Sequence, residues 1–208
     1  MSRGLGDVYK RQAQNGGKPF PAEKFVNKIP VKKHDHVLIP AGTVHCSGAD
    51  TMVLEISATP YIFTFKLWDW GRVDLDGKPR PIHLEHGAAN IQWYRNTEWV
   101  HRNLVNAVAE VYTGENGTVV RTGLHEREFL DTFRFTTSSA LPVHRNVSVH
   151  MLNLVDGTRA VLRSKSDAFP PLELHYAETC IVPQAAGDYE ISSPDGSEVK
   201  VILACVRN

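Results

Sequence analysis

The chain has 208 residues, with 23 basic and 23 acidic side chains and a formal net charge of zero. Balanced charge gives no reason to expect a nucleic-acid or membrane partner, and no apolar run approaches the roughly 18 residues that a membrane span needs. The cysteines, Cys46, Cys180 and Cys205, are odd in number and lack CxxC spacing, so disulfides are not expected. We therefore expect a cytoplasmic protein.

The first 22 residues are expected to lie outside the fold. Residues 1–12 have neither the apolar region of a signal peptide nor a capped amphipathic pattern. They resemble a translated adapter sequence that recurs at the broken edges of assembled reading frames, although an ordinary disordered tail would look the same. Residues 13–22 have the glycine and proline content of a loop.

The turn at Pro40–His45 is the first segment that indicates chemistry. Residues 37–39 and 51–56 have the apolar patterns of strands, so the sequence predicts one hairpin with the turn between its strands. The glycine at position 42 permits a tight bend. Pro-x-Gly-x-x-His is the second half of the metal-binding signature of cupins, which are small jelly-roll barrels. His45 is therefore the candidate metal ligand, although a lone strand histidine is more often structural.

Cys46 follows this histidine directly and is not expected to be a second ligand. Adjacent residues of a strand face opposite sides of the sheet, so the thiol would point away from any ion that His45 binds. We expect Cys46 to be a small buried thiol.

Further motifs follow within forty residues and make the pattern more specific. They are Leu54-Glu55-Ile56, then Thr64-Phe65-Lys66-Leu67-Trp68-Asp69-Trp70-Gly71-Arg72, then Asp76-Gly77-Lys78-Pro79-Arg80-Pro81-Ile82-His83-Leu84-Glu85. In this order and spacing, they resemble the class I mannose-6-phosphate isomerases. The resemblance is strong over about residues 30–90 and weaker elsewhere.

This resemblance implies a zinc-assisted conversion of an aldose into a ketose, with a sugar or sugar phosphate as substrate. The family holds its metal with a Gln-x-His pair, a glutamate and a later histidine, and only the last matches a position here, His45. The other ligands would lie upstream of residue 30, and a catalytic zinc needs about three protein ligands. We therefore expect a C-terminal portion of a mannose-6-phosphate isomerase, inactive on its own.

The resemblance also implies which residues act on the substrate. Glu55 is a carboxylate on an apolar strand, and its burial would cost several kcal/mol unless it met a cation or hydroxyl groups. Lys66 stands where the family has a catalytic arginine, if one inserted residue is allowed. It keeps the positive charge but loses the planar fork. The resemblance also implies that Arg72 is a catalytic residue and that Arg80 and Trp68 bind the substrate.

Roles for the neighbours of these residues are less specific. Asp69 is expected to pair with Arg72 or to cap the turn, and either tryptophan of this run could pack the end of the barrel. His83 lies in a segment that the family shares, and no chemical role follows for it.

The second half of the chain echoes the first. Residues 35–40 and 53–56 resemble residues 178–183 and 201–204, which implies a second barrel over residues 131–208. Its turn places Asp188 where the first copy has His45, so this barrel is expected to be degenerate, metal-free and non-catalytic.

The strands expected in the second barrel include residues 132–137, 147–155 and 159–163, with Asp156-Gly157 as a two-residue hairpin turn. Residues 91–130 are expected to be a linker with a short helix at 98–112, which Gly114 ends.

The sequence therefore predicts a mainly β protein of cupin-like jelly-roll barrels: an incomplete first barrel over residues 23–90 and a second over 131–208. The expected function is part of a zinc-dependent sugar-phosphate isomerase. The alternative is a metal-free cupin that binds carbohydrate or has a regulatory role. The loss of the signature at Asp188 and the lysine at position 66 favour this alternative, whereas the retained His45, Glu55 and Arg72 favour the isomerase more.

Overall fold

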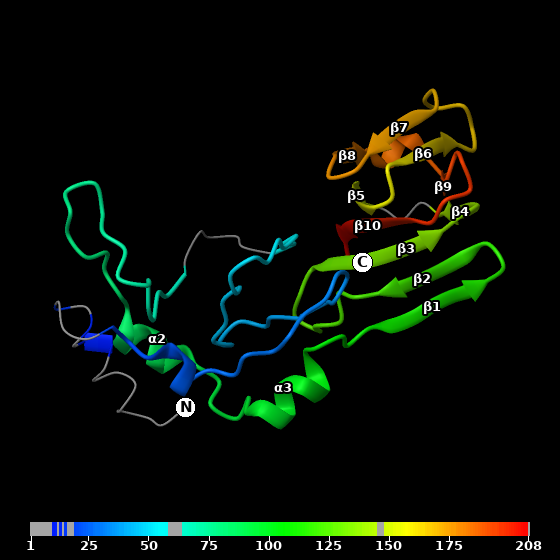
Figure 1. The fold of residues 1–208 in the computed structure, drawn as a ribbon. Coiled ribbons are helices and arrows are strands. Elements are labelled where there is room, and N and C mark those ends of the chain that lie inside the picture. The colour runs from blue at the N-terminus through cyan, green and yellow to red at the C-terminus, as the bar shows by residue number, and fades with distance from the viewer. Residues whose placement is uncertain are drawn as a thin grey trace. The chain divides into compact units, whose positions relative to one another are not determined.

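The computed structural model describes residues 10, 11, 13, 15, 19–57, 64–144 and 148–207 (Figure 1). The chain divides into two compact units. Unit 1 comprises Met1–Asp35, Ile39–Thr51 and Thr59–Leu104, and unit 2 comprises His36–Leu38, Met52–Ala58 and Val105–Asn208. The predicted tail of residues 1–22 lies mostly outside the described residues.

Unit 2 contains two antiparallel sheets. The six-stranded sheet has, in spatial order, β1 (Ala109–Gly114), β2 (Gly117–Arg121), β3 (Leu130–Thr137), β10 (Val199–Val206), β5 (His150–Asp156) and β8 (Thr179–Val182). The four-stranded sheet has β4 (Ala140–Val143), β9 (Tyr189–Ser192), β6 (Arg159–Ser164) and β7 (Leu172–His175). A short 3-10 helix, η2 (Gln184–Ala186), joins β8 to β9.

The strand order is that of a jelly roll. Between β3 and β10, every connection except that from β6 to β7 carries the chain from one sheet to the other. This leaves β3, β10, β5 and β8 on one side, and β4, β9, β6 and β7 on the other, which is an eight-stranded double-sheet arrangement. The mainly β prediction is thus confirmed, and the second half of the chain has the predicted jelly-roll topology.

The core of unit 2 lies between its sheets and follows from strand alternation. Leu152 and Leu154 on β5 are fully buried. Met151, which precedes them on the same strand and faces the other side of the sheet, is exposed. The opposite sheet contributes Leu162 and Ile191, which are also fully buried. Side chains two residues apart share a face of a strand, so apolar residues at this spacing close the space between the sheets.

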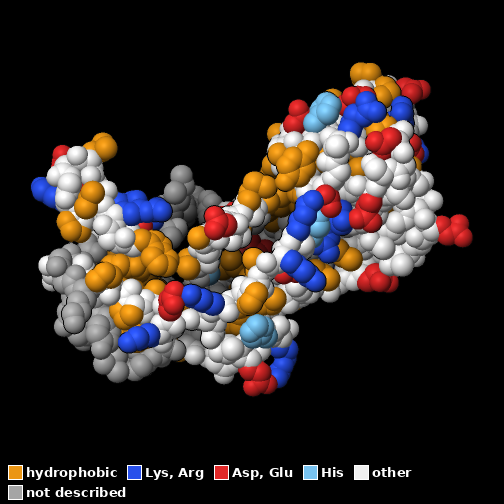
Figure 2. Space-filling view, in the orientation of Figure 1, with side chains coloured by type: hydrophobic (Ala, Val, Ile, Leu, Met, Phe, Trp, Pro, Cys, Tyr) orange, Lys and Arg blue, Asp and Glu red, His pale blue; other side chains and the backbone are white. Residues whose placement is uncertain are grey.

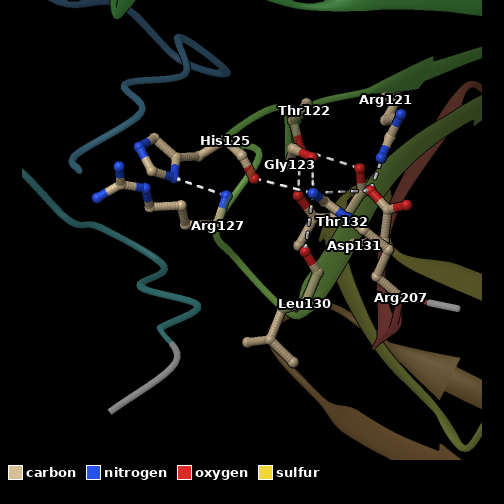
Figure 3. Close-up of polar contacts among 9 residues, drawn as sticks. All are labelled: Arg121, Thr122, Gly123, His125, Arg127, Leu130, Asp131, Thr132 and Arg207. Atoms are coloured by element: carbon tan, nitrogen blue, oxygen red, sulfur yellow. Dashed lines mark hydrogen bonds and ion pairs between the residues drawn. The ribbon is translucent and has the colours of Figure 1, made fainter. Parts of the chain in front are cut away.

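An arginine near the end of β10 fastens a long loop to the sheet (Figure 3). Arg207 donates from Nη2 to the carbonyls of Gly123 at 2.7 Å and Leu130 at 3.3 Å, and from Nη1 to that of His125 at 2.9 Å. The carboxylate of Asp131 lies 3.9 Å from the same guanidinium. One side chain therefore binds two carbonyls of the loop and that of Leu130, the first residue of β3.

The predicted hairpin at Asp156-Gly157 is wrong. β5 ends at Asp156 and β6 begins at Arg159, but β5 pairs with β10 and β8 whereas β6 pairs with β9 and β7. Gly157, at φ 87°, lies in a connection that crosses between the sheets. The expected strand at 147–155 starts outside the described residues, and the observed strand begins at His150.

The helix predicted over 98–112 is also shorter than expected. Helix α3 runs over Thr97–Asn103, with the side chain of Asn96 accepting a hydrogen bond from the backbone of Trp99. Asn106 then has a positive φ of 51°, which interrupts helical geometry. The apolar residues beyond it belong to β1 and its approach, so β1 and β2 form within the predicted linker.

Unit 1 contains η1 (Ala22–Lys24), α2 (Leu84–Asn90) and α3. The strands predicted at 37–39 and 51–56 do not form: Val37 makes one isolated bridge to Val105, and residues 51–56 have no ladder. A strand requires a neighbour that pairs with its backbone along its length, and none of the described segments supplies one here. The interpretation of residues 23–90 as part of a first barrel stays a prediction.

Among the described residues, no helix combines the length and apolar character that crossing a bilayer would require.

Candidate functional site

The turn before His45 is tightly built against a second segment of unit 1. Gly42 has a φ of 84°, and a Cβ there would lie 2.6 Å from the carbonyl oxygen of Asn90 and 2.8 Å from Cγ of Gln92. The carbonyl of Gly42 accepts a hydrogen bond from the backbone N–H of Gln92 at 2.9 Å. Glycine is required both for its conformation and for this close approach.

His45 is exposed, and one of its ring nitrogens is already engaged. Its Nδ1 lies 2.9 Å from the carbonyl oxygen of Thr43. A carbonyl oxygen only accepts hydrogen bonds, so Nδ1 carries a proton in this contact, and in the neutral ring Nε2 then keeps its lone pair. Metal-binding histidines commonly donate their other ring N–H to a carbonyl in this manner. The ring is thus arranged as that of a ligand would be.

Arg95 holds the same turn, and the sequence did not single it out. Its Nη1 donates to the carbonyls of Pro40 at 3.0 Å and Ala41 at 2.8 Å, and to Oγ1 of Thr43. Arginine in a sequence gives no sign of which distant turn it will bind. The sequence does show that Arg95 directly follows Trp93 and Tyr94. Because arginine stacks well on aromatic rings, this position was the one sign that its side chain could be held in place.

Lys66 is held through its backbone by His83. The backbone N–H of Lys66 donates to Nδ1 of His83 at 3.1 Å, and the backbone N–H of His83 donates to the carbonyl of Lys66 at 2.7 Å. Nδ1 of His83 is therefore an acceptor, the opposite arrangement from that of His45. His83 gains a structural role here, fixing the lysine-bearing segment at the start of α2.

Two residues of the run at 64–72, Trp68 and Asp69, have partners within unit 1, whereas Trp70 and Arg72 are exposed. Trp68 is half-buried, and its ring centroid lies 5.4 Å from that of Phe20, which lies inside the predicted tail and is buried. The buried Asp69 carboxylate pairs with Nε of Arg80 at 3.0 Å rather than with Arg72, which is exposed. The expected Asp69–Arg72 pair is replaced by an ion pair that engages a predicted substrate-binding residue.

Glu55 belongs to unit 2, whereas the other five predicted site residues belong to unit 1. It is exposed, so the predicted burial of its carboxylate is wrong; without strand partners, residues 51–56 do not alternate between core and solvent. The convergence of Glu55 with His45 and Lys66 on one cavity stays a prediction.

Glu55 does line a hollow of about 400 Å³ within unit 2. The hollow is bounded by Leu54, Glu55, Ile56, Ser57, Leu130, Val149, Met151, Asn153, Thr179, Ala204, Cys205 and Val206. Hydrophobic side chains reach the surface in several places on the face shown in Figure 2. Met52, Val53 and Ile181 are the most exposed large apolar residues of unit 2, at 82%, 63% and 66%.

The described residues do not by themselves make a zinc site. Nowhere among them do three or more histidine, cysteine, aspartate or glutamate side chains come together as metal ligands would. Cys46 is exposed rather than buried, which corrects the expectation, because the strand that would have covered it does not form.

The position that corresponds to His45 in unit 2 is engaged differently. Asp188, after η2, pairs with Nδ1 of His144 at 3.2 Å. An aspartate bound to a neighbouring imidazole has one oxygen fewer to offer an ion. The metal-free character of the second barrel stays a prediction that this contact supports.

Part of this chain is similar in sequence to curated mannose-6-phosphate isomerases. No family model matches the chain. It is 35% identical over 63 residues to mannose-6-phosphate isomerase of Streptococcus mutans, covering 30% of this chain and 20% of the relative. It is 33% identical over 70 residues to mannose-6-phosphate isomerase ManA of Bacillus subtilis, covering 34% and 22%.

The match thus spans about a fifth of the length of these curated relatives. Among solved structures, the mannose 6-phosphate isomerase of Bacillus subtilis matches with a TM-score of 0.49 and 12% identity, over 67% of this chain and 39% of that one. The predicted resemblance to mannose-6-phosphate isomerases is confirmed over about a third of the chain.

Proposed function

We propose that this chain is part of a sugar-phosphate isomerase that interconverts an aldose and a ketose, of the mannose 6-phosphate to fructose 6-phosphate type. The observation that carries the proposal is the match of 63 to 70 residues, at 33% to 35% identity, to two curated mannose-6-phosphate isomerases. Sequence identity of this level is more specific than the jelly-roll topology, which hosts many functions.

His45 is proposed as the metal ligand of this chain. The Nδ1–H of its ring is fixed on the carbonyl of Thr43, and Nε2 is available on an exposed ring. One histidine does not hold zinc at useful affinity, and the described residues add no cluster of ligands. We therefore propose that the other ligands belong to a longer protein of which this chain is the C-terminal portion, and that the chain alone is inactive.

The cationic side chains of unit 1 would act on negative charge in the substrate. Isomerisation through an enediolate places negative charge on two neighbouring oxygens, and a fixed cation stabilises such charge most where water is partly excluded. Lys66 is half-buried on a segment fixed by His83, so it is the better placed of the catalytic cations. Arg72, which is exposed, suits a phosphate group that stays solvated.

Glu55, Arg80 and Trp68 complete the proposed set. A carboxylate such as Glu55 is the kind of group that removes a proton from a sugar carbon. The side chain of Arg80 is 38% exposed, while Asp69 holds its Nε in place. Trp68 offers an aromatic face for a sugar, although Phe20 occupies part of its surroundings.

A chimera tests this function directly. The N-terminal portion of the Bacillus subtilis ManA protein would be joined before residue 23 of this chain. The isolated chain should show no isomerase activity on mannose 6-phosphate and no zinc binding beyond that of an exposed histidine, whereas the chimera should show both. In the chimera, His45→Ala should remove most of the bound zinc, and Lys66→Ala should keep the metal but lower kcat.

His101→Ala is the matched control, since His101 is an exposed histidine on α3 of the same unit. It should leave zinc content and activity unchanged. A chimera whose zinc content survives His45→Ala would refute the assignment of the ligand, and a folded, zinc-loaded chimera without isomerase activity would refute the function.

The second candidate function is a metal-free cupin that binds carbohydrate. Asp188, engaged by His144 at the position corresponding to His45, is the observation that favours it. Calorimetric titration of the isolated chain with mannose 6-phosphate in the presence of a chelator separates the two. Saturable binding there would support the second candidate, and its absence, together with an active chimera, would support the first.

A further inference from the structure

We propose that Arg95 is a positioning residue that sets the orientation and the tautomer of His45. The inference rests on the proposed role of His45 and deepens it. It concerns only contacts within unit 1, where Arg95 and the turn at 40–45 both lie.

Arg95 reaches His45 through a single intervening residue. Oγ1 of Thr43 accepts from Nη1 of Arg95, the carbonyl oxygen of Thr43 accepts from Nδ1 of His45, and the backbone N–H of Thr43 donates to the carbonyl of Pro40 at 3.1 Å. Thr43 is thus fixed at its side chain, its carbonyl and its amide. The direction of its carbonyl decides where the His45 ring can place its Nδ1–H.

The guanidinium fixes the rest of the turn at the same time. Nη1 also donates to the carbonyls of Pro40 at 3.0 Å and Ala41 at 2.8 Å. These are carbonyls of a turn with no ladder partner, and a charged donor binds them more strongly than a neutral one does. The two N–H groups of Nη1 are thus shared among three oxygens of the turn.

Aromatic rings hold the guanidinium in its place. Its carbon lies 5.5 Å from the centroid of the Tyr94 ring and 5.4 Å from that of Trp99, and these rings meet edge to face at 5.5 Å. Asn96 caps the helix that carries Trp99. A cation placed on aromatic faces is attracted by them, so Arg95 is preorganised before it meets the turn.

Loss of this side chain should therefore appear at the His45 ring. Without Arg95, the carbonyl of Ala41 loses its donor, that of Pro40 keeps only the N–H of Thr43, and Thr43 loses its side-chain anchor, so its carbonyl is held less firmly. The imidazole then has no fixed acceptor for Nδ1–H. A histidine in that condition exchanges between its tautomers and rotamers instead of presenting Nε2 in one direction.

The ring nitrogens of His45 report this state by NMR of the full chain labelled with ¹⁵N, without metal or substrate. At a pH where the imidazole is neutral, long-range ¹H–¹⁵N correlations should show Nδ1 protonated and Nε2 unprotonated in the wild type, with His45→Gln identifying the signals. Arg95→Met should remove this difference and bring the two nitrogen shifts towards one another. Arg95→Lys, whose ammonium has three donors, should restore part of the difference.

Arg102→Met is the matched control, because Arg102 is an exposed arginine of α3 that pairs with Glu98. It should leave the His45 shifts at wild-type values. Thr43→Val provides a second route if Arg95→Met does not fold, as judged by amide dispersion: it removes only the hydroxyl acceptor and should also reduce the preference for Nδ1–H.

The two proposals fail separately in these experiments. Wild-type His45 shifts in folded Arg95→Met, or in Thr43→Val, would overturn the positioning role whatever the metal chemistry. A tautomer shift in Arg95→Met, together with a chimera whose zinc is unaffected by His45→Ala, would keep the positioning role and overturn the ligand.

Discussion

Nδ1 of His150 lies 2.9 Å from the hydroxyl oxygen of Tyr189, and this hydrogen bond joins the two sheets of unit 2. His150 is on β5 and Tyr189 on β9, and both side chains are buried. Burial lowers the pKa of His150 and raises that of the Tyr189 phenol. The interior of the jelly roll thus favours the neutral form of both groups.

The stability of unit 2 should therefore fall in mild acid. The unfolded state, with a histidine pKa near the ordinary value of 6.5, binds more protons than the folded state once the pH drops below that value. Stability is complete above it and is lost as the pH falls towards the lowered folded pKa. His150→Gln should reduce the difference between urea unfolding free energies at about pH 8 and about pH 5.

His36 acts in the same direction, since burial, with a contribution from Arg134, lowers its pKa too. His150→Gln should therefore flatten the pH dependence in part. The variant could instead lose the same unfolding free energy at both pH values, so that the difference between them stays as in the wild type. That result would show that the hydrogen bond contributes to stability and that protonation of His150 does not.

The clamp made by Arg207 should be worth measurable stability. Arg207→Met leaves the carbonyls of Gly123, His125 and Leu130 without this donor, and hydrogen bonds from charged groups contribute about 1.5 to 3 kcal/mol. We expect a loss of roughly 2 to 3 kcal/mol in the free energy of unfolding, measured with urea. Arg127→Met, at an exposed arginine of the same loop (Figure 3), should cost little; equal losses would contradict the clamp.

The cysteines should react in the order of their exposure. Cys46 is exposed, Cys180 is half-buried with a pKa raised by burial, and Cys205 is buried. Since the thiolate is the reactive form, iodoacetamide under native conditions should modify Cys46 first and Cys180 much more slowly, with Cys205 reacting only after unfolding. Mass spectrometry of tryptic peptides gives the order, and early labelling of Cys205 would show that β10 opens.

The exposed segment at residues 52–54 should promote self-association. Met52 and Val53 are exposed at 82% and 63% in a stretch of strand-forming sequence, and such surface favours contact between chains. Val53→Lys should lower the fraction of oligomer measured by light scattering at high concentration. Thr51→Lys adds the same charge without removing apolar surface, and an equal effect there would point to net charge alone.

The strands of unit 2 were predictable where local pattern and tertiary environment agree. In β3, Phe133 and Phe135 alternate with polar residues, so the position of this strand follows from periodicity. The hairpin at Asp156-Gly157 failed because a short glycine-containing connection fits a turn within a sheet and a crossing between sheets equally well. The choice between these depends on β9 and β10, which lie far along the chain.

The helix prediction failed for a related reason. Val100 and Leu104 at helical spacing belong to α3 and its end, but Val108 and Val111 continue the same spacing into a strand. β-branched residues favour strands, and pairing with β2 decides the outcome. The period alone could not reveal where one element ends, and the positive φ of Asn106 marks that point only in the structure.

The candidate site was predictable in part. The spacing of the proline, glycine and histidine in the turn at 40–45 can be recognised in the sequence. In the structure, Asn90 and Gln92 leave no room for a side chain at Gly42. Arg95 was missed because two of its three partners in the turn are backbone carbonyls more than fifty residues away, and backbone carbonyls carry no sequence signal. Partners identified by side-chain chemistry can be predicted, whereas partners identified only by geometry cannot.

The position of β10 has a consequence for how the protein emerges from the ribosome. β10 pairs along its whole length with β3 on one side, and over Lys200–Cys205 with β5 on the other. It nevertheless follows all the other strands that the structure describes (Figure 1). Until residues 199–206 have left the exit tunnel, the sheet has a vacant centre, and β3 and β5 present edges open to wrong partners. Jelly-roll closure therefore waits until residues 199–206 have been made, and slow translation before residue 199 should prolong exposure to chaperones.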